Sequence, residues 1–174
     1  MAAWNEISKD YQYDGDATKA SELYAEKTAV MAYSDLCKQE GGKTSTYRDE
    51  IIHIDAIPAS RRMSQPPATL DFLCGICKRS KDANKIQKEK GWHFLMGECR
   101  FNYKNPRNIT KNEIAGKISG TRSLLSKDLS TLFQKIVFLF PDTCVQEARS
   151  HLARLNPKQN WLAITQKEFQ TIFD

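Results

Sequence analysis

The sequence has no apolar run long enough to cross a membrane as a helix. About 18 consecutive apolar residues would be needed, and the longest run, Ile136 to Phe140, is far shorter. The first residues, Met1 to Glu6, contain neither the basic nor the apolar stretch of a secretion signal. We therefore expect a protein of the cytoplasm or the nucleus.

The sequence also lacks the short motifs that mark common enzyme families. It contains no G-x-S-x-G, no P-loop, no G-x-G-x-x-G and no H-E-x-x-H. Cys144 and His151 lie two helical turns apart, about 10 Å, which is too far for a nucleophile and its base. We predict that the protein is not an enzyme, and a cysteine-dependent enzyme remains an alternative.

Disulfide bonds are not expected, because the chain has five cysteines, an odd number, and no secretion signal. Cys74, Cys77, His93 and Cys99 have the number and type of ligands that zinc needs. His93 and Cys99 would be about 20 Å apart on a straight strand, so they could share a metal only if the chain reverses at Gly97. Packed thiols are the favoured interpretation, and a structural zinc site is the alternative.

The net charge of +5 is unevenly distributed. Residues 1–50 carry six Lys and Arg against ten Asp and Glu, or −4, whereas residues 51–110 carry eleven against five, or +6. Residues 111–174 carry nine against six, or +3. A basic middle segment attracts phosphate backbones, although it would also be found on an ordinary solvated face.

The most basic part of the chain, residues 78–107, also contains several aromatic residues. Cations neutralise phosphates and aromatic rings stack on bases, a combination typical of proteins that bind single strands. The alternative is that the aromatic residues are core and the lysines coat a helix. The candidate contacts are Lys78, Arg79, Lys81, Lys85 and Lys88 for phosphate, and Trp92 and Arg100 for stacking or groove contacts.

The front half of the chain is predicted to contain two helices and two strands. Residues 16–38 have good helix propensity and end before a Gly-Gly pair, and residues 51–57 are typical of a short strand. Leu70, Leu73, Cys74 and Cys77 recur at helical spacing, which predicts a helix that runs on to Lys90. The aromatic residues 92–103 indicate a strand.

The back half is predicted to be helical. Thr110 and Glu113 form a capping box for a short helix, and Thr165 and Glu168 form another for a terminal helix. Between them, apolar residues recur with a period of 3.6 and predict a long helix: Leu124, Leu125, Leu129, Leu132, Phe133, Ile136, Val137 and Phe140. A further helix is expected to follow Pro141, capped by Asp142 or Thr143.

These patterns predict one compact α+β domain over residues 1–174, mainly α, with a small sheet packed on helices and a C-terminal helical subbundle. The best candidate for a subdomain joint is at 105–110. The leading functional hypothesis is a non-enzymatic regulatory or accessory protein that binds nucleic acid, RNA in preference to DNA, and no membrane. The alternative is an adaptor that binds a protein partner in an apolar groove between the C-terminal helices.

Overall fold

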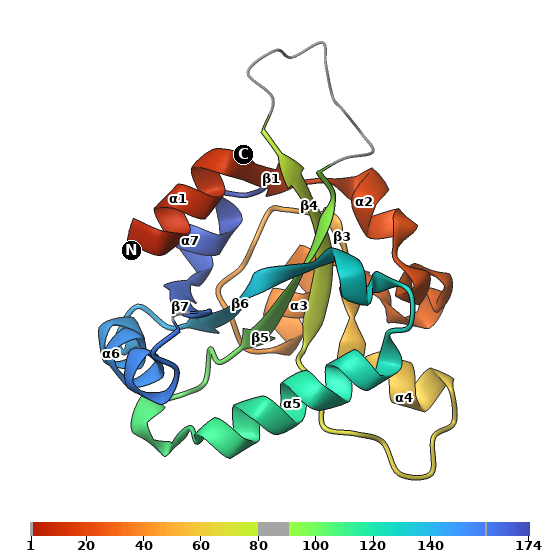
Figure 1. The fold of residues 1–174 in the computed structure, drawn as a ribbon. Helices are drawn as coiled ribbons and strands as arrows, with labels where there is room; N and C mark the ends of the chain where they lie inside the picture. The colour runs from red at the N-terminus through yellow and green to blue at the C-terminus, as the bar shows by residue number, and fades with distance from the viewer. Residues whose placement is uncertain (1, 80–90, 159) are drawn as a thin grey trace.

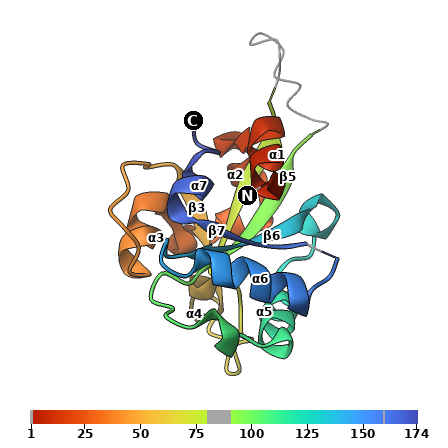
Figure 2. The same cartoon turned by 90° about the vertical axis from the view of Figure 1, so that its left-hand side faces the viewer.

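The computed structural model describes residues 2–79, 91–158 and 160–174 and contains a central sheet with helices on both faces (Figure 1; Figure 2). The helices are α1 (Ala2–Asp10), α2 (Gly15–Ala20), α3 (Tyr33–Gln39), α4 (Ile57–Ser60), α5 (Lys111–Leu124), α6 (Val145–Leu155) and α7 (Gln166–Gln170). The strands are β1 (Tyr11–Tyr13), β2 (Val30–Ala32), β3 (Glu50–His53), β4 (Phe72–Lys78), β5 (His93–Cys99), β6 (Leu132–Phe140) and β7 (Trp161–Thr165). Short 3-10 helices occupy 22–25, 27–29, 54–56, 106–108 and 128–131.

The strands follow the order β2-β3-β4-β5-β6-β7, and β1 also pairs with β4. Neighbouring strands from β2 to β5 are antiparallel, whereas β5, β6 and β7 are parallel to one another. Parallel neighbours need crossover connections, which α5 and α6 provide. As a result the C-terminal ends of β5, β6 and β7 lie side by side, next to the start of β4. We call this end of the sheet, where these strands finish, the carboxyl edge.

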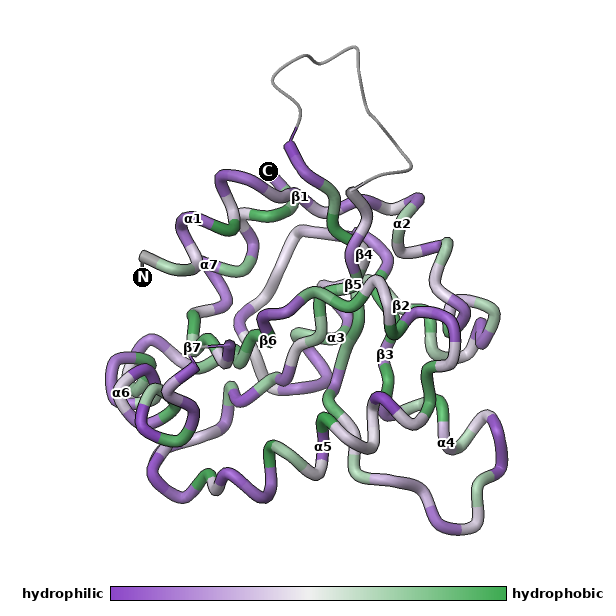
Figure 3. Tube along the Cα trace, in the orientation of Figure 1, coloured by the Kyte–Doolittle hydropathy of each residue, from purple (hydrophilic) through white to green (hydrophobic). Residues whose placement is uncertain are grey.

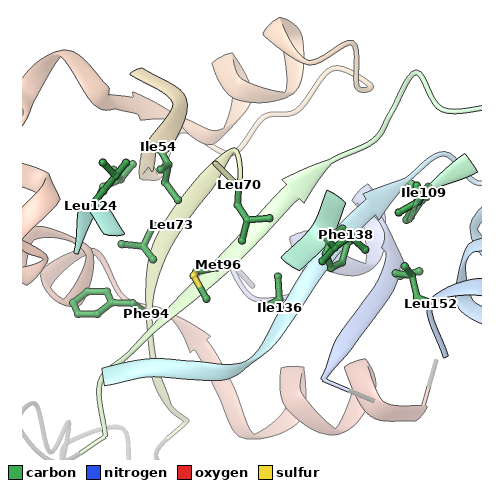
Figure 4. Packing of buried hydrophobic residues seen from close by; sticks show 14 of the residues in the cluster. Ile54, Leu70, Leu73, Phe94, Met96, Ile109, Leu124, Ile136, Phe138 and Leu152 are labelled. Carbon is green, nitrogen blue, oxygen red and sulfur yellow. The ribbon is translucent and has the colours of Figure 1, made fainter. Parts of the chain in front are cut away.

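The core has two parts, one on each face of the sheet. On the face covered by α5 and α6, the α5 face, Met96 and Phe138 of the strands pack with Leu124 and Leu152 (Figure 4). On the other face, beneath α1, α3 and α7, a second apolar cluster includes Trp4, Leu36 and Phe169. The protein is therefore a three-layer sandwich of helices, sheet and helices.

The first and last helices are bound to each other. The indole of Trp4 on α1 donates to the carbonyl of Glu168 on α7 at 2.7 Å, and its ring stacks on Phe169 at 5.8 Å. The backbone N–H of Tyr13 donates to the carbonyl of Ile172 at 2.7 Å. Residues far apart in the sequence thus form one packed unit on this face (Figure 2).

The prediction of a mainly α fold with a small sheet was wrong. Of the described residues, 45% are helical and 24% are in strands, and their sheet has seven strands of mixed direction. The expected C-terminal helical subbundle is also replaced, because residues 132–140 and 161–165 form strands β6 and β7. The structure is a balanced α/β sandwich.

The predicted helix over residues 124–140 is instead the end of α5, a 3-10 turn and strand β6. Phe138 packs on the α5 face and Leu139 on the other, so both faces of β6 are buried. A central strand buried on both faces is a continuous apolar run, and such a run matches helical and strand periods alike. The most hydrophobic stretches lie on the central strands (Figure 3).

The predicted helix from Leu70 onward was wrong for the same reason, since residues 72–78 form the buried strand β4; residues 80–90 of that helix lie outside the described residues. Strand β5 does not reverse at Gly97. Instead Gly97 pairs with Phe72 on β4, and the Phe72 ring lies over it. A Cβ on Gly97 would be 2.0 Å from the Phe72 Cζ atom, so this position needs glycine.

Several other predictions agree with the structure. The predicted strands at 51–57 and 92–103 correspond in part to β3 and β5, and helix α5 starts with Thr110 as its cap and continues past Gly120. The capping box of Thr165 and Glu168 opens α7.

Two further predictions differ from the structure. The N-cap position of α6 is Cys144 and not Asp142 or Thr143. The predicted helix at 16–38 is divided into α2, β2 and α3.

Among the described residues, no helix is both long and apolar enough to cross a membrane.

Replacing Gly97 with alanine should destabilise the protein by about 1–3 kcal/mol, the usual cost of overpacking a core. The new methyl group would collide with the Phe72 ring, which is itself fully buried. Urea denaturation gives the change in the free energy of unfolding.

The matched control is Gly116→Ala in α5, where a Cβ would have nothing within 4 Å. This substitution should stabilise the protein by up to about 1 kcal/mol, because alanine is the better helix former. Equal effects of the two substitutions would contradict the packing of Phe72 over Gly97.

Candidate functional site: a buried carboxylate pair at the carboxyl edge

The four candidate zinc ligands are not brought together. Cys74 and Cys77 lie three residues apart on strand β4, so their side chains point to opposite faces of the sheet. The His93 ring packs against Tyr11 and Phe133 at the start of β5, whereas Cys99 lies at the other end of that strand. No group of three or more His, Cys, Asp or Glu residues in the described ranges could hold a metal ion.

The cysteine–histidine pair of the enzyme alternative is also separated. The Cys144 thiol donates to the carbonyl of Tyr103 at 3.4 Å, and His151 Nε2 donates to the carbonyl of Ile109 at 2.8 Å. Each side chain thus has a backbone partner of its own. All five cysteines are free and buried, as packed thiols would be.

The candidate nucleic-acid residues have different environments. Lys78 is exposed at the end of β4, and Trp92 is half-buried. The Arg79 guanidinium donates to the carbonyls of Ser8 and Thr171 at 2.9 and 3.0 Å, so it fastens the terminal segments to the sheet. Three of the predicted contacts lie outside the described residues: Lys81, Lys85 and Lys88.

Arg100, predicted to stack on bases, belongs instead to a buried cluster of charges at the carboxyl edge. Its side chain is only 10% exposed. Its Nη2 atom donates to Glu113 Oε1 at 2.6 Å and forms an ion pair with Glu98 Oε1 at 3.0 Å. This cluster was missed by sequence reasoning.

Two buried carboxylates form the centre of the cluster. Glu98 is near the end of β5 and Asp71 directly precedes β4. The register of the two strands pairs Phe72 with Gly97, which sets Asp71 opposite Glu98 on the α5 face. The two residues are 5% and 1% exposed, which is rare for acids in proteins.

The hydrogen bonds of the pair leave one oxygen atom without a partner. Glu98 Oε1 accepts from Lys117 Nζ on α5 at 2.5 Å and forms an ion pair with Arg100. Asp71 Oδ2 accepts from the backbone N–H of Cys99 at 2.5 Å. Glu98 Oε2 is buried and accepts no hydrogen bond from any described residue. A buried carboxylate oxygen normally has a partner, so this atom is a candidate for contact with a ligand.

Burial raises the pKa of both carboxyl groups. The pKa of Asp71 rises to about 8 because the group is desolvated and because the negative charge of Glu98 is close, while the Cys99 N–H and Lys117 oppose the rise. Burial also raises the pKa of Glu98, against the attraction of Arg100 and Lys117. Both cations contact Glu98 and favour its ionised form, whereas the raised pKa of Asp71 favours its protonated form.

This arrangement has the features of a site for a hard divalent cation. Mg²⁺ prefers oxygen ligands and is commonly held by one or two carboxylates together with substrate phosphates and water. Glu98 Oε2 offers an unused oxygen, and a cation bound there would displace the proton from Asp71. Lys117, 22% exposed, lies at the boundary between the pair and solvent. Two carboxylates are the smallest donor set for such an ion, and its remaining ligands would have to come from a substrate and water.

The sequence did contain a signal for this cluster. Asp71 lies immediately before an apolar strand, and Glu98 and Arg100 end another. Charged residues at the ends of strands that are buried on both faces are costly unless they are paired. The signal could not be used while residues 70–90 were interpreted as a helix.

The comparisons with known proteins give no family: no family model matches the chain, and neither curated proteins nor solved structures give a significant match.

Replacing Asp71 with asparagine should change how stability depends on pH. The folded-state pKa of Asp71 is raised to about 8, so folding favours its protonated form, and this contribution is lost as the pH rises from about 4 to 8. Asparagine cannot ionise. The variant should therefore gain stability relative to the wild type across this range, on the order of a few kcal/mol, and the difference should level off above pH 8.

Urea denaturation at a series of pH values measures this difference. The matched control is Asp35→Asn, which removes an exposed carboxylate from α3. If the stability difference for Asp71→Asn stayed constant from pH 4 to 9, the pKa of Asp71 would not be raised by folding.

The cysteines of the folded protein should react slowly with iodoacetamide at neutral pH. Burial raises the pKa of Cys74 to about 12 and that of Cys37 and Cys77 to about 11, so little thiolate forms. Mass spectrometry should find almost no label before denaturation and five labels after it. If one cysteine were labelled as fast as free cysteine, this would support the alternative hypothesis of a cysteine-dependent enzyme.

Proposed function

We propose that this protein binds nucleic acid and hydrolyses phosphodiester bonds at the Asp71–Glu98 pair with a divalent cation. The observation that carries the proposal is the buried, unpartnered Glu98 Oε2 atom beside a second carboxyl group and two cationic side chains. Titratable groups with perturbed pKa values that converge on one point are typical of catalytic sites. The nucleic-acid part retains the hypothesis from the sequence, whereas the catalytic part departs from its expectation of no enzyme activity.

The position of the pair in the sheet is consistent with a ligand site. In open α/β sheets, ligands bind at the carboxyl ends of the parallel strands; Glu98 is next to the last residue of β5, and Asp71 directly precedes β4. Residues 51–110, which contain both acids, carry a net charge of +6. A phosphate backbone is attracted by such a segment and can supply the remaining oxygen ligands of a cation.

Each charged group has a distinct role in this proposal. Glu98 and Asp71 hold the cation, and Arg100 positions Glu98 while Glu113 in turn orients Arg100. Lys117 contacts the non-bridging oxygen of the bound phosphate, a role that its partial exposure permits. A cation held there would polarise the phosphoryl group and lower the pKa of a bound water.

The overall reaction consumes one water. The water oxygen forms a bond to phosphorus, and the bond from phosphorus to one ester oxygen breaks. The leaving oxygen takes up a proton, so the products are a phosphomonoester and an alcohol. Nucleic acid is present in the cytoplasm and the nucleus, the locations that the sequence predicts.

The proposed adaptor loses its structural basis, since the C-terminal groove was expected between helices and residues 132–140 form a central strand. A protein partner remains an untested prediction.

Cleavage of labelled oligonucleotides tests the proposed activity. Single-stranded and double-stranded DNA and RNA are incubated with the protein and Mg²⁺ or Mn²⁺, and products are resolved on denaturing gels. At least one substrate should be cut, and chelation should stop the reaction. Glu98→Gln should lower the rate at least about 100-fold, because even the loss of an outer partner of a metal can cost that much.

The control for this experiment is Asp35→Asn, which should cut at the wild-type rate. Circular dichroism confirms that Glu98→Gln is folded, and isothermal titration of Mn²⁺ in buffers of different ionisation enthalpy reports proton release on binding. Absence of cleavage for all four substrates, or full activity of Glu98→Gln, would refute the proposed chemistry. Failure to bind any of the four at low salt would refute the nucleic-acid function.

A further inference from the structure

A second feature of the carboxyl edge is a cavity of about 480 Å³. It lies between the loop that follows α3, the end of β6 and the first turn of α7, and Phe101 forms part of its wall. Phe101 is half-buried and packs against the apolar cluster of the α3 side. Apart from Phe101, the cavity is thus formed by elements other than β4 and β5, which position the Asp71–Glu98 pair.

The wall of the cavity is fixed by close backbone packing. Gly41 has a φ of +77°, a conformation that favours glycine. A Cβ on Gly42 would be 2.8 Å from the Phe101 ring and 2.9 Å from Gln166 Oε1. The N–H of Lys43 donates to Gln166 Oε1 at 2.8 Å, and Gln166 Nε2 donates back to the Lys43 carbonyl at 2.7 Å. The loop is therefore held in place before any ligand arrives.

The side chains around the cavity combine an aromatic ring with amide and cationic groups. Gln170, also in the wall, donates to Ser45 Oγ at 3.0 Å through Nε2. Lys167 is exposed at the rim, and Lys43 pairs with Asp142 at 2.5 Å in a pair that is 79% and 58% exposed. Exposed ion pairs are weak, so Lys43 can exchange Asp142 for a phosphate. Aromatic rings stack on bases, and cations pair with phosphates.

The cavity is close to the carboxylate pair along the chain. Phe101 follows Glu98 by three residues, a separation of at most about 11 Å between their Cα atoms. One segment of a nucleic-acid strand can therefore place a phosphate at the carboxylate pair and a base in the cavity. The pair lies on the α5 face, whereas the cavity opens beside α7, so a strand in contact with both must pass over the sheet edge. A base inside a duplex cannot enter the cavity, because its edge and both its faces are occupied.

We propose that this cavity takes one unpaired base of the nucleic acid whose backbone crosses the Asp71–Glu98 pair. The preferred ligand is therefore a single strand, a loop or an unpaired end, and a fully paired duplex is a poor one. This inference rests on the proposed function for the class of ligand. It does not rest on the hydrolysis.

The test uses a single-stranded oligonucleotide that carries the fluorescent base 2-aminopurine, bound in EDTA so that no cleavage occurs. Stacking on Phe101 should quench its fluorescence, and the same sequence in a full duplex should show no quenching on binding. Phe101→Leu should abolish the quenching and weaken binding at least about 5-fold, the lower value for loss of one stacked base.

Two further variants make the result independent of the stability of Phe101→Leu. Phe133→Leu is the matched control, since Phe133 is also a half-buried phenylalanine packed on the same cluster, at the end of β6 away from the cavity. This variant should quench the 2-aminopurine fluorescence and bind the oligonucleotide as the wild type does. Lys167→Glu reverses an exposed charge at the rim and should weaken binding of the single strand.

The outcomes for the two proposals are separate. Loss of quenching in Phe101→Leu, with quenching retained in Glu98→Gln, supports the base site whether or not the wild type cleaves. Wild-type quenching and affinity in both Phe101→Leu and Lys167→Glu would overturn the base site and leave the proposed hydrolysis standing if Glu98→Gln is inactive. Equal quenching of single strand and duplex would also overturn the base site.

Discussion

The structure depends on the parallel pairing of β5 with β6. Both strands are buried on their two faces, and this requires helices above and below the sheet. Parallel pairing in turn requires the crossover through α5, which lays Lys117 and Glu113 over the end of β5. The same constraint therefore creates the core, fixes the layer order and assembles the charged cluster.

Local signals identified the segments whose ends are marked by side-chain chemistry. Thr110 and Thr165 cap helices that the structure contains, because a hydroxyl that accepts a backbone N–H is specific to the start of a helix. The central strands carry no such local mark. Residues 132–140 and 72–78 are apolar on both faces, and only tertiary pairing decides between helix and strand for such runs.

The charged cluster was hidden by this same ambiguity. Asp71 and Glu98 are 27 positions apart in the sequence, and only the antiparallel register of β4 and β5 places them opposite each other. The cysteines drew attention because C-x-x-C is a compact motif, but a strand sends Cys74 and Cys77 to opposite faces. The prediction of nucleic-acid binding came from composition, without knowledge of the fold, and it remains untested. The carboxylate site could be found only after the sheet was known.

The contact between the first and last helices has a consequence for biosynthesis. Trp4 is almost fully buried, and the groups that enclose it include Phe169 and the Glu168 carbonyl. Helix α1 leaves the ribosome long before its partner is made, because Trp4 and Glu168 are 164 positions apart in the sequence. Until then Trp4 is exposed, and exposed apolar side chains make an incompletely folded chain prone to aggregation. Closure of this long-range contact is an expected slow step in folding, because contacts of large sequence separation form late.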